Sequence, residues 1–315
     1  MNTTEQSEAR TVAAVRVPLD RSRQAADYLR TAGGGVMDTL AHFWDRLALT
    51  PPLARDDLHL VVIGKPKSTT ATINFASAYG AMLYVPKAHR ADVLASSAEA
   101  ADAMCDYLQA WWNGNPPQKA AAVTAETPNP PLPLNYITGL ADGISAMTPR
   151  LLSMVNRKTA ARKTVNIMMK LPADKPAALS NKVRLARDGD EPILNRWRKL
   201  YNQERGILFD ADVDAWIESR NVYVHENNGA IVALAKFGLI LPTTVEIGGV
   251  FTFPEYRKQG FGAELVDDLA ARIRQMGKTP LLQVDADNDP ALALYKKMNW
   301  IELGRLARIW LNSAA

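Results

Sequence analysis

One short stretch in the second half of the chain combines residue types that suit the binding of an anion. In VFTFPEYRKQGFGAELVDDLA, residues 250–270, a strand-like run and a proline lead through Arg257, Gly260 and Gly262 into a helical pattern. The first turn of a helix presents free backbone N–H groups at its positive end, and glycines let that backbone approach an oxygen without a Cβ in the way. The junction is typical of a phosphate site, with an ordinary turn before a helix as the alternative.

The ligand that this junction favours is a pyrophosphate, although not the pyrophosphate of NAD. Gly260 and Gly262 are not followed by the third glycine of a dinucleotide fingerprint. No β-α-β pattern precedes them either, so a nucleotide cofactor of another kind is expected.

The elements around the junction alternate regularly between residues 183 and 311. The patterns predict the order β-α-α-β-β-β-α-β-α-β-β, with a strand at 244–251 before the glycines and two closing strands in 300–311. Asn227-Asn228-Gly229 between two β-prone runs predicts a hairpin. After the glycines a helix is expected to cover the sheet, because apolar residues recur every three or four positions: Phe261, Leu265, Leu269, Ile273 and Met276.

Length and composition indicate a soluble protein of two domains. The 315 residues exceed a typical single domain, and the proline-containing stretch 171–181 predicts a boundary between domains at 1–175 and 181–315. The N-terminus lacks the pattern of a secretory signal, and no apolar run is long enough for a membrane span. The single cysteine fits a reducing compartment, so a cytoplasmic location is expected. One cysteine and four scattered histidines give no reason to expect a metal site.

Positive charge is concentrated in the middle of the chain. The formal net charge is +4, whereas residues 150–187 hold ten basic residues and one acidic residue. Such a stretch suits contact with nucleic acid or with another anion such as a nucleotide cofactor. A solvated helix face and linker is the alternative, and no aromatic residue interleaves the run as in proteins that bind single strands.

In element order and in two motifs, residues 183–311 resemble the GCN5-related N-acetyltransferase (GNAT) superfamily, and VFTFPEYRKQGFG is most similar to its FR47-like branch. The pyrophosphate loop of the superfamily, Arg/Gln-x-x-Gly-x-Gly/Ala, falls on Arg257, Gly260 and Gly262. Its second element, Asn-x-x-Ala-x-x-Leu-Tyr, is met in full within QVDADNDPALALYKKMNW. One departure is Asn299-Trp300 in place of Gly-Phe, and asparagine tolerates the left-handed conformation nearly as well as glycine.

The resemblance implies a fold class and an acyl donor. The fold class is α/β (α+β), with a C-terminal GNAT fold of a mixed, mostly antiparallel twisted sheet and flanking helices, preceded by an α/β domain. Acetyl-CoA would dock where the fourth and fifth strands of this fold splay apart. The residues implied in binding are Phe251 and Thr252 for the pantetheine arm, Arg257, Lys258, Gln259, Gly260, Gly262 and Ala263 for the pyrophosphate, and Asn288 beside the site.

The resemblance also implies acyl transfer without an acyl-enzyme. A neutral amine would attack the thioester directly, and Tyr295 would protonate the departing thiolate. A packed position in an amphipathic helix is the alternative for Tyr295, and a helix cap is the alternative for Asn288. For the general base we expect Glu246 on the fourth strand, with Asp285 and Glu226 as rivals and an ordinary solvated strand glutamate as the alternative.

The acceptor and the N-terminal half are less defined by the sequence. Members of the superfamily acetylate small amines, antibiotics, protein N-termini, lysines and aminoacyl groups, and acceptor pockets lie in variable loops. The basic stretch adds the hypothesis of an amine carried on nucleic acid, and a non-catalytic acetyl-CoA-binding regulator is a further alternative. In FR47-like proteins a degenerate copy of the fold often precedes the active one. The sequence pattern predicts a helix over 139–157 and a strand over 164–171. This stretch, ITGLADGISAMTPRLL followed by TVNIMMKL, is similar to that arrangement, with an unrelated helical domain as the alternative.

Overall fold

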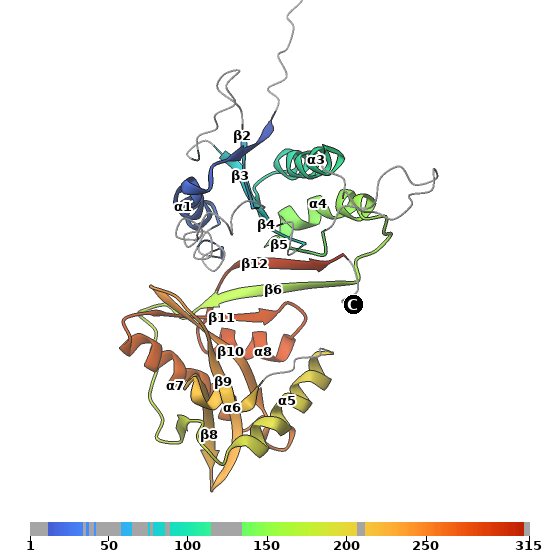
Figure 1. Cartoon of the computed structure of the whole chain (residues 1–315). Coiled ribbons are helices and arrows are strands. Elements are labelled where there is room, and N and C mark those ends of the chain that lie inside the picture. Colours follow the sequence, from blue (N-terminus) through green and yellow to red (C-terminus); the bar gives the residue numbers. More distant parts are fainter. Residues whose placement is uncertain are drawn as a thin grey trace, which may run out of the picture. The chain divides into compact units, whose positions relative to one another are not determined.

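The computed structural model describes residues 12–33, 36–37, 41, 58–64, 75, 78–85, 89–114, 134–206 and 212–311. The chain divides into two compact units. The N-terminal unit comprises Met1–Asn166 and Gly304–Ala315, and the C-terminal unit comprises Ile167–Leu303. Figure 1 shows the elements of both units, which are described one at a time below.

The C-terminal unit is a mixed sheet with helices on both faces. Its strand order is β6 (Arg162–Lys170, which begins in the N-terminal unit), β11 (Thr279–Asp285), β10 (Thr244–Thr252), β9 (Ala230–Ile240), β8 (Val222–Asn227) and β7 (Val183–Leu185). Its helices are α5 (Glu191–Arg205), α6 (Val213–Glu218), α7 (Phe261–Gln275) and α8 (Asp289–Lys297), and a 3₁₀ turn, η5, spans Pro254–Tyr256. β10 and β11 are parallel, whereas β7, β8, β9 and β10 pair antiparallel in sequence order. This is the mixed, mostly antiparallel sheet that was expected.

Two separate apolar clusters show which helices cover which face of that sheet. Strand residues that alternate along the chain point to opposite faces. Val224 and Leu234 pack with Trp197 of α5, whereas Ala233 and Ala235 pack with Leu269 of α7. α5 and α6 therefore cover one face, and α7 and α8 cover the other.

The hairpin predicted at Asn227-Asn228-Gly229 is confirmed. Asn227 pairs with Ala230, and the two turn residues Asn228 and Gly229 have φ values of +50° and +78°. These left-handed values are what a two-residue turn needs in order to match the twist of its strands.

Two other predictions in this region are wrong. Residues 300–311 form one strand, β12 (Ile301–Trp310), in place of two, because the segment has no proline or two-residue turn signal to interrupt it. Met276 was expected to face the sheet, but α7 ends at Gln275 and Met276 is 46% exposed. Its position just after the last turn removes it from the apolar stripe.

The N-terminal unit is also a sheet covered by helices. Its strand order is β1 (Ala13–Val17), β2 (His59–Gly64), β3 (Ala78–Val85), β4 (Arg90–Ala95), β5 (Tyr136–Leu140) and β12. β4 and β5 are parallel, and the other neighbouring pairs are antiparallel. The helices are α1 (Ser22–Ala32), α3 (Ala98–Gly114) and α4 (Ala141–Met154), with a 3₁₀ turn, η1, at Leu19–Arg21. The core beneath α3 and α4 includes Met104, Leu108, Ile144 and Leu151.

Gly139 belongs to a strand, whereas the sequence pattern predicted a helix over 139–157. A Cβ at this position would lie 2.1 Å from the carbonyl oxygen of Val93 on the neighbouring strand β4. Glycine therefore permits the close pairing of β5 with β4, and the helix α4 begins only at Ala141.

Candidate active site

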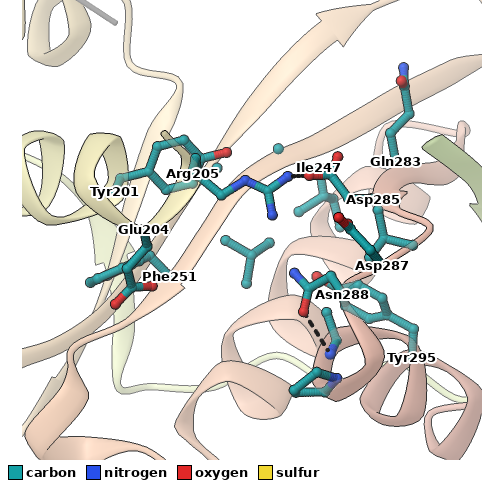
Figure 2. Close-up of a pocket in the computed structure, with 16 residues that line it drawn as sticks. Tyr201, Glu204, Arg205, Ile247, Phe251, Gln283, Asp285, Asp287, Asn288 and Tyr295 are labelled. Atoms are coloured by element: carbon teal, nitrogen blue, oxygen red, sulfur yellow. Dashed lines mark hydrogen bonds and ion pairs between the residues drawn. The ribbon is translucent and has the colours of Figure 1, made fainter. Parts of the chain in front are cut away.

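A pocket of about 460 Å³ opens in the C-terminal unit where β10 and β11 separate. The end of α5 forms one wall, and the segment leading into α8 forms another (Figure 2). The lining residues are Tyr201, Glu204, Arg205, Ile247, Gly248, Gly249, Val250, Phe251, Gln283, Val284, Asp285, Asp287, Asn288, Pro290, Ala291 and Tyr295.

The pocket exists because two parallel strands stop pairing. β10 and β11 are in register from Thr244 with Thr279 to Ile247 with Leu282, and the paired register ends there. On its other edge β10 carries a bulge, since Gly248 is opposite Lys236 whereas Phe251 is opposite Leu234. The bulged residue Gly249 has φ +63° and lines the pocket. The splay and the bulge leave backbone groups of β10 available to a ligand.

The glycine junction has the conformation that makes glycine necessary there. Gly260 is the residue before α7 and has φ +89°. A Cβ on Gly262 would lie only 2.9 Å from Oγ1 of Thr252, the last residue of β10. The predicted phosphate loop, 257–263, therefore runs from the end of β10 directly into the N-terminus of α7. Its two glycines serve different purposes. Gly260 permits the left-handed conformation, and Gly262 permits the close approach of Thr252.

Arg257 turns its side chain toward α5. Its guanidinium donates to Oε1 of Glu204 at 2.6 Å and to the carbonyl oxygen of Thr252 at 3.0 Å. It also lies over the ring of Phe251, 5.3 Å from the centroid. The side chain thus links the predicted phosphate loop to the last turn of α5.

Tyr295, in α8, is a buried residue, and its side chain lines the pocket. The residue is 5% exposed, and no hydrogen bond to its hydroxyl is present in the described part of the chain. Burial raises the pKa of Tyr295 to about 12, with a smaller contribution from Tyr201. The hydroxyl therefore keeps its proton at neutral pH and has that proton available for a ligand.

Asn288 has both of the roles that its sequence position allows. Its side chain accepts a hydrogen bond from the backbone N–H of Ala291 at 3.3 Å and so caps α8. It also lines the pocket beside Tyr295 (Figure 2). Capping fixes the start of the helix that carries Tyr295.

The three carboxylates considered as a general base lie in different surroundings. Asp285, at the end of β11, lines the pocket and forms an ion pair with Arg205. Glu246 does not line it, but its Oε2 is 3.4 Å from Nε2 of the lining residue Gln283. Glu226 lies at a second cavity and pairs with Arg184 at 2.7 Å. Of the three, Asp285 has direct access to the pocket.

The sequence reasoning did not find the residues that α5 contributes. Tyr201, Glu204 and Arg205 line the pocket, and only a three-dimensional arrangement brings the end of this helix to β10 and β11. The bulge had a usable signal, because Gly248-Gly249 inside a strand pattern indicates a bulge or a close backbone approach.

The described residues offer neither a cluster of metal ligands nor a helix that could span a membrane. No group of three or more His, Cys, Asp or Glu side chains in this part of the chain is arranged to hold a metal ion. None of the helices described is both long and apolar enough to cross a bilayer.

Solved structures with the same arrangement identify the fold. The chain is similar to a GNAT-family acetyltransferase from Colwellia psychrerythraea, with TM-score 0.50, 10% identity, and coverage of 96% of this chain and 99% of that one. It is also similar to a GCN5-related N-acetyltransferase from Sphaerobacter thermophilus, with TM-score 0.51, 13% identity, and 97% of both chains covered. A Drosophila protein gives TM-score 0.54, 12% identity, and coverage of 94% and 98%. These matches span both units and show the GNAT fold, as expected for a GNAT domain preceded by a GNAT-like copy.

The sequence itself identifies the family of the C-terminal part. Residues 191–300 match the acetyltransferase (GNAT) family, and this part of the chain belongs to it. The predicted family is thereby confirmed for this part of the chain, and the family match supports an N-acetyltransferase activity. Assignment to the FR47-like branch stays a prediction. No curated protein gives a significant match to the chain.

Proposed function

We propose that the chain transfers the acetyl group of acetyl-CoA to a primary amine in the pocket of the C-terminal unit. The observation that carries the proposal is the hydroxyl of Tyr295, which makes no hydrogen bond within the described residues and belongs to a buried side chain that lines the splay of β10 and β11. A protonated phenol at that place is suited to donating a proton to a leaving thiolate.

The residues present fit a CoA thioester. Gly249, Val250 and Phe251 would pair their backbone with the pantetheine arm, because β10 stops pairing with β11 after Ile247 and leaves this edge open. The N–H groups from Lys258 to Ala263 would hold the pyrophosphate at the start of α7. When bound, acetyl-CoA supplies the activated acetyl group.

We assign the proton-accepting role to Asp285 in preference to Glu246, our first choice from the sequence. Asp285 lines the pocket, whereas Glu246 does not line it and contacts the lining residue Gln283. Asp285 would take a proton from the acceptor ammonium, and Tyr295 would hold the proton that the leaving sulfur receives. Glu246→Gln and Asp285→Asn variants separate the two assignments, because loss of the base removes the acidic limb of the pH–rate profile.

A rate measurement separates catalysis from the alternative of a non-catalytic acetyl-CoA-binding regulator. Tyr295→Phe removes the hydroxyl and keeps the packed ring. We expect it to lower kcat by about 10² or more, the range of general acid–base catalysis, with acetyl-CoA affinity unchanged. Initial rates with an amine panel and calorimetry with CoA give the two values. An unchanged rate would end the general-acid assignment, and binding without turnover in the intact protein would favour the regulator.

An acceptor carried on nucleic acid has less support from the structure. Within the basic stretch 150–187, Arg150 pairs with Asp102 and Asp106 and Arg184 pairs with Asp190 and Glu226. These charges are partly neutralised. The acceptor panel should nevertheless include aminoalkyl-modified oligonucleotides, for which salt-dependent binding would favour this alternative.

A further inference from the structure

The last residue of α5 has a side chain to which the proposed chemistry assigns no role. Arg205 lines the pocket, and its guanidinium extends across it toward Asp285 at the end of β11 (Figure 2). The two side chains form an ion pair, and they are 27% and 25% exposed. A cation and an anion of the protein therefore border the same space and contact one another.

These two groups match the two charges of a zwitterion. A guanidinium binds a carboxylate through two parallel hydrogen bonds, and a carboxylate accepts hydrogen bonds from an ammonium group. Because Arg205 and Asp285 touch, a molecule inserted between them needs its own opposite charges on neighbouring atoms. An α-amino acid meets that condition, since its ammonium and carboxylate groups share one carbon atom.

The exchange keeps every charge paired. Insertion replaces one ion pair of the protein with two ion pairs to the ligand, so neither Arg205 nor Asp285 is left in the pocket without a partner. A purely cationic amine would instead separate Asp285 from Arg205 and leave the guanidinium facing a like charge.

The neighbouring carboxylates agree with this arrangement. Glu204, which follows Tyr201 on the same wall, is already held by Arg257 at 2.6 Å and does not compete for Arg205. Asp287 lies on the α8 side with Asp285, so negative charge gathers at the end of the pocket where the ammonium would lie (Figure 2).

We propose that the acceptor is an α-amino acid or a molecule that ends in one, with its carboxylate on Arg205 and its amine on Asp285. This inference rests on the proposed function and names the substrate class of the same site. The ammonium gives a proton to Asp285, and the neutral nitrogen forms a bond to the acetyl carbon as the carbon–sulfur bond breaks. The sulfur receives the proton of Tyr295, and the second proton that the nitrogen loses as the amide forms restores the phenol of Tyr295.

The test compares acceptors that differ in one charge. For each α-amino acid of a panel, the rate of acetylation by acetyl-CoA is compared with the rates for its amide and for its decarboxylated amine. Binding of each α-amino acid to the protein without acetyl-CoA is followed by thermal shift. We expect kcat/KM for the free acid to exceed that for the amide by about tenfold or more, the effect of one hydrogen-bonded charge. Arg205→Gln should abolish this preference, and Arg205→Lys should keep part of it. Lys199→Gln, which removes one charge from an exposed position of the same helix, should leave the preference unchanged.

Several outcomes would overturn the proposal. Equal or faster acetylation of the amides and decarboxylated amines would reject it while leaving N-acetyltransfer intact. Binding of acetyl-CoA without transfer to any α-amino acid of the panel would also reject it. Absence of both acetyl-CoA binding and transfer would reject the proposed function itself.

Discussion

At the scale of single residues, the two glycines before α7 have separable physical roles. Gly260 has φ +89°, a value that a side chain makes unfavourable by about 1 kcal/mol or more. Gly262 is not in the left-handed region, but a Cβ on this residue would lie 2.9 Å from Oγ1 of Thr252. Gly277, after the other end of α7, shares the positive φ of Gly260 at +71° and is remote from the predicted phosphate loop.

Gly262→Val should therefore weaken acetyl-CoA binding by more than tenfold, because the new side chain displaces Thr252 from the end of β10. Gly277→Ala strains the backbone without touching the loop, so it should lower the melting temperature and leave the affinity unchanged. Calorimetry and thermal melts of both variants provide the comparison. Equal losses of affinity in the two variants would mean that the effect is one of general stability.

Glu264 provides a pH-dependent contact at the same helix start. Its carboxylate accepts from Oγ of Ser180 at 2.7 Å and contacts Nε2 of the buried His225 at 2.9 Å. The hydrogen bond from Ser180, followed by that from His225, lowers the pKa of Glu264 below its ordinary 4.5. A lowered folded-state pKa means that this stabilisation is present above pH 4.5 and is lost as the pH falls through the folded value.

We expect the melting temperature of the intact protein to fall more steeply below pH 4.5 than that of Glu264→Gln, which has no such proton to bind. Melts between pH 3 and pH 7 measure the difference between the intact protein and the variant. Parallel curves for the intact protein and Glu264→Gln would show that other groups determine the acid sensitivity.

At the scale of elements, α5 is held to both sides of the pocket by two adjacent residues. Glu204 pairs with Arg257 of the predicted phosphate loop, and Arg205 pairs with Asp285 of β11. The sequence assigned Arg257 to the cofactor, but its guanidinium is already bound by Glu204 and the Thr252 carbonyl oxygen.

A double-mutant cycle tells whether Arg257 serves the phosphate or α5. If it ties the loop to α5, Arg257→Gln and Glu204→Gln should each increase hydrogen exchange in 198–206, and the double variant should add little more. Affinity for CoA should then differ little between Glu204→Gln and the double variant. If the double variant instead binds CoA at least tenfold more weakly than Glu204→Gln alone, Arg257 is a phosphate ligand.

The sequence predicted those parts of the fold that are governed by local pattern. The Asn228-Gly229 hairpin and the helix at 261–275 follow from turn chemistry and periodicity, and both are present. The contribution of Tyr201 and Arg205 could not be predicted, because it depends on where the end of α5 lies relative to β10 and β11. Gly139 was wrongly predicted to be helical. Glycine is needed there because Val93 on β4 approaches closely, and Val93 is distant in the sequence.

At the scale of the whole molecule, the two units differ in the functional groups that they contain for the proposed reaction. The pocket and the glycine junction belong to the C-terminal unit. The one cysteine, Cys105, is buried in the N-terminal unit, and burial raises its thiol pKa to about 12, so it is not a nucleophile at neutral pH.

Hydrogen exchange with and without CoA should therefore show protection in 247–263 and in the first turn of α8, and none in the core strands of the N-terminal unit. The expectation follows from the location of the pocket and the predicted phosphate loop. Protection centred on β2 to β4 would place the cofactor in the other unit and contradict the account.

The measurement that tests the central claim most directly is isothermal titration of the intact protein with acetyl-CoA. The account predicts saturable binding of one molecule per chain with micromolar affinity, weakened by substitution of Gly262. Absence of binding at millimolar acetyl-CoA would contradict the account, because the splay of β10 and β11 would then belong to a GNAT fold that does not bind the donor.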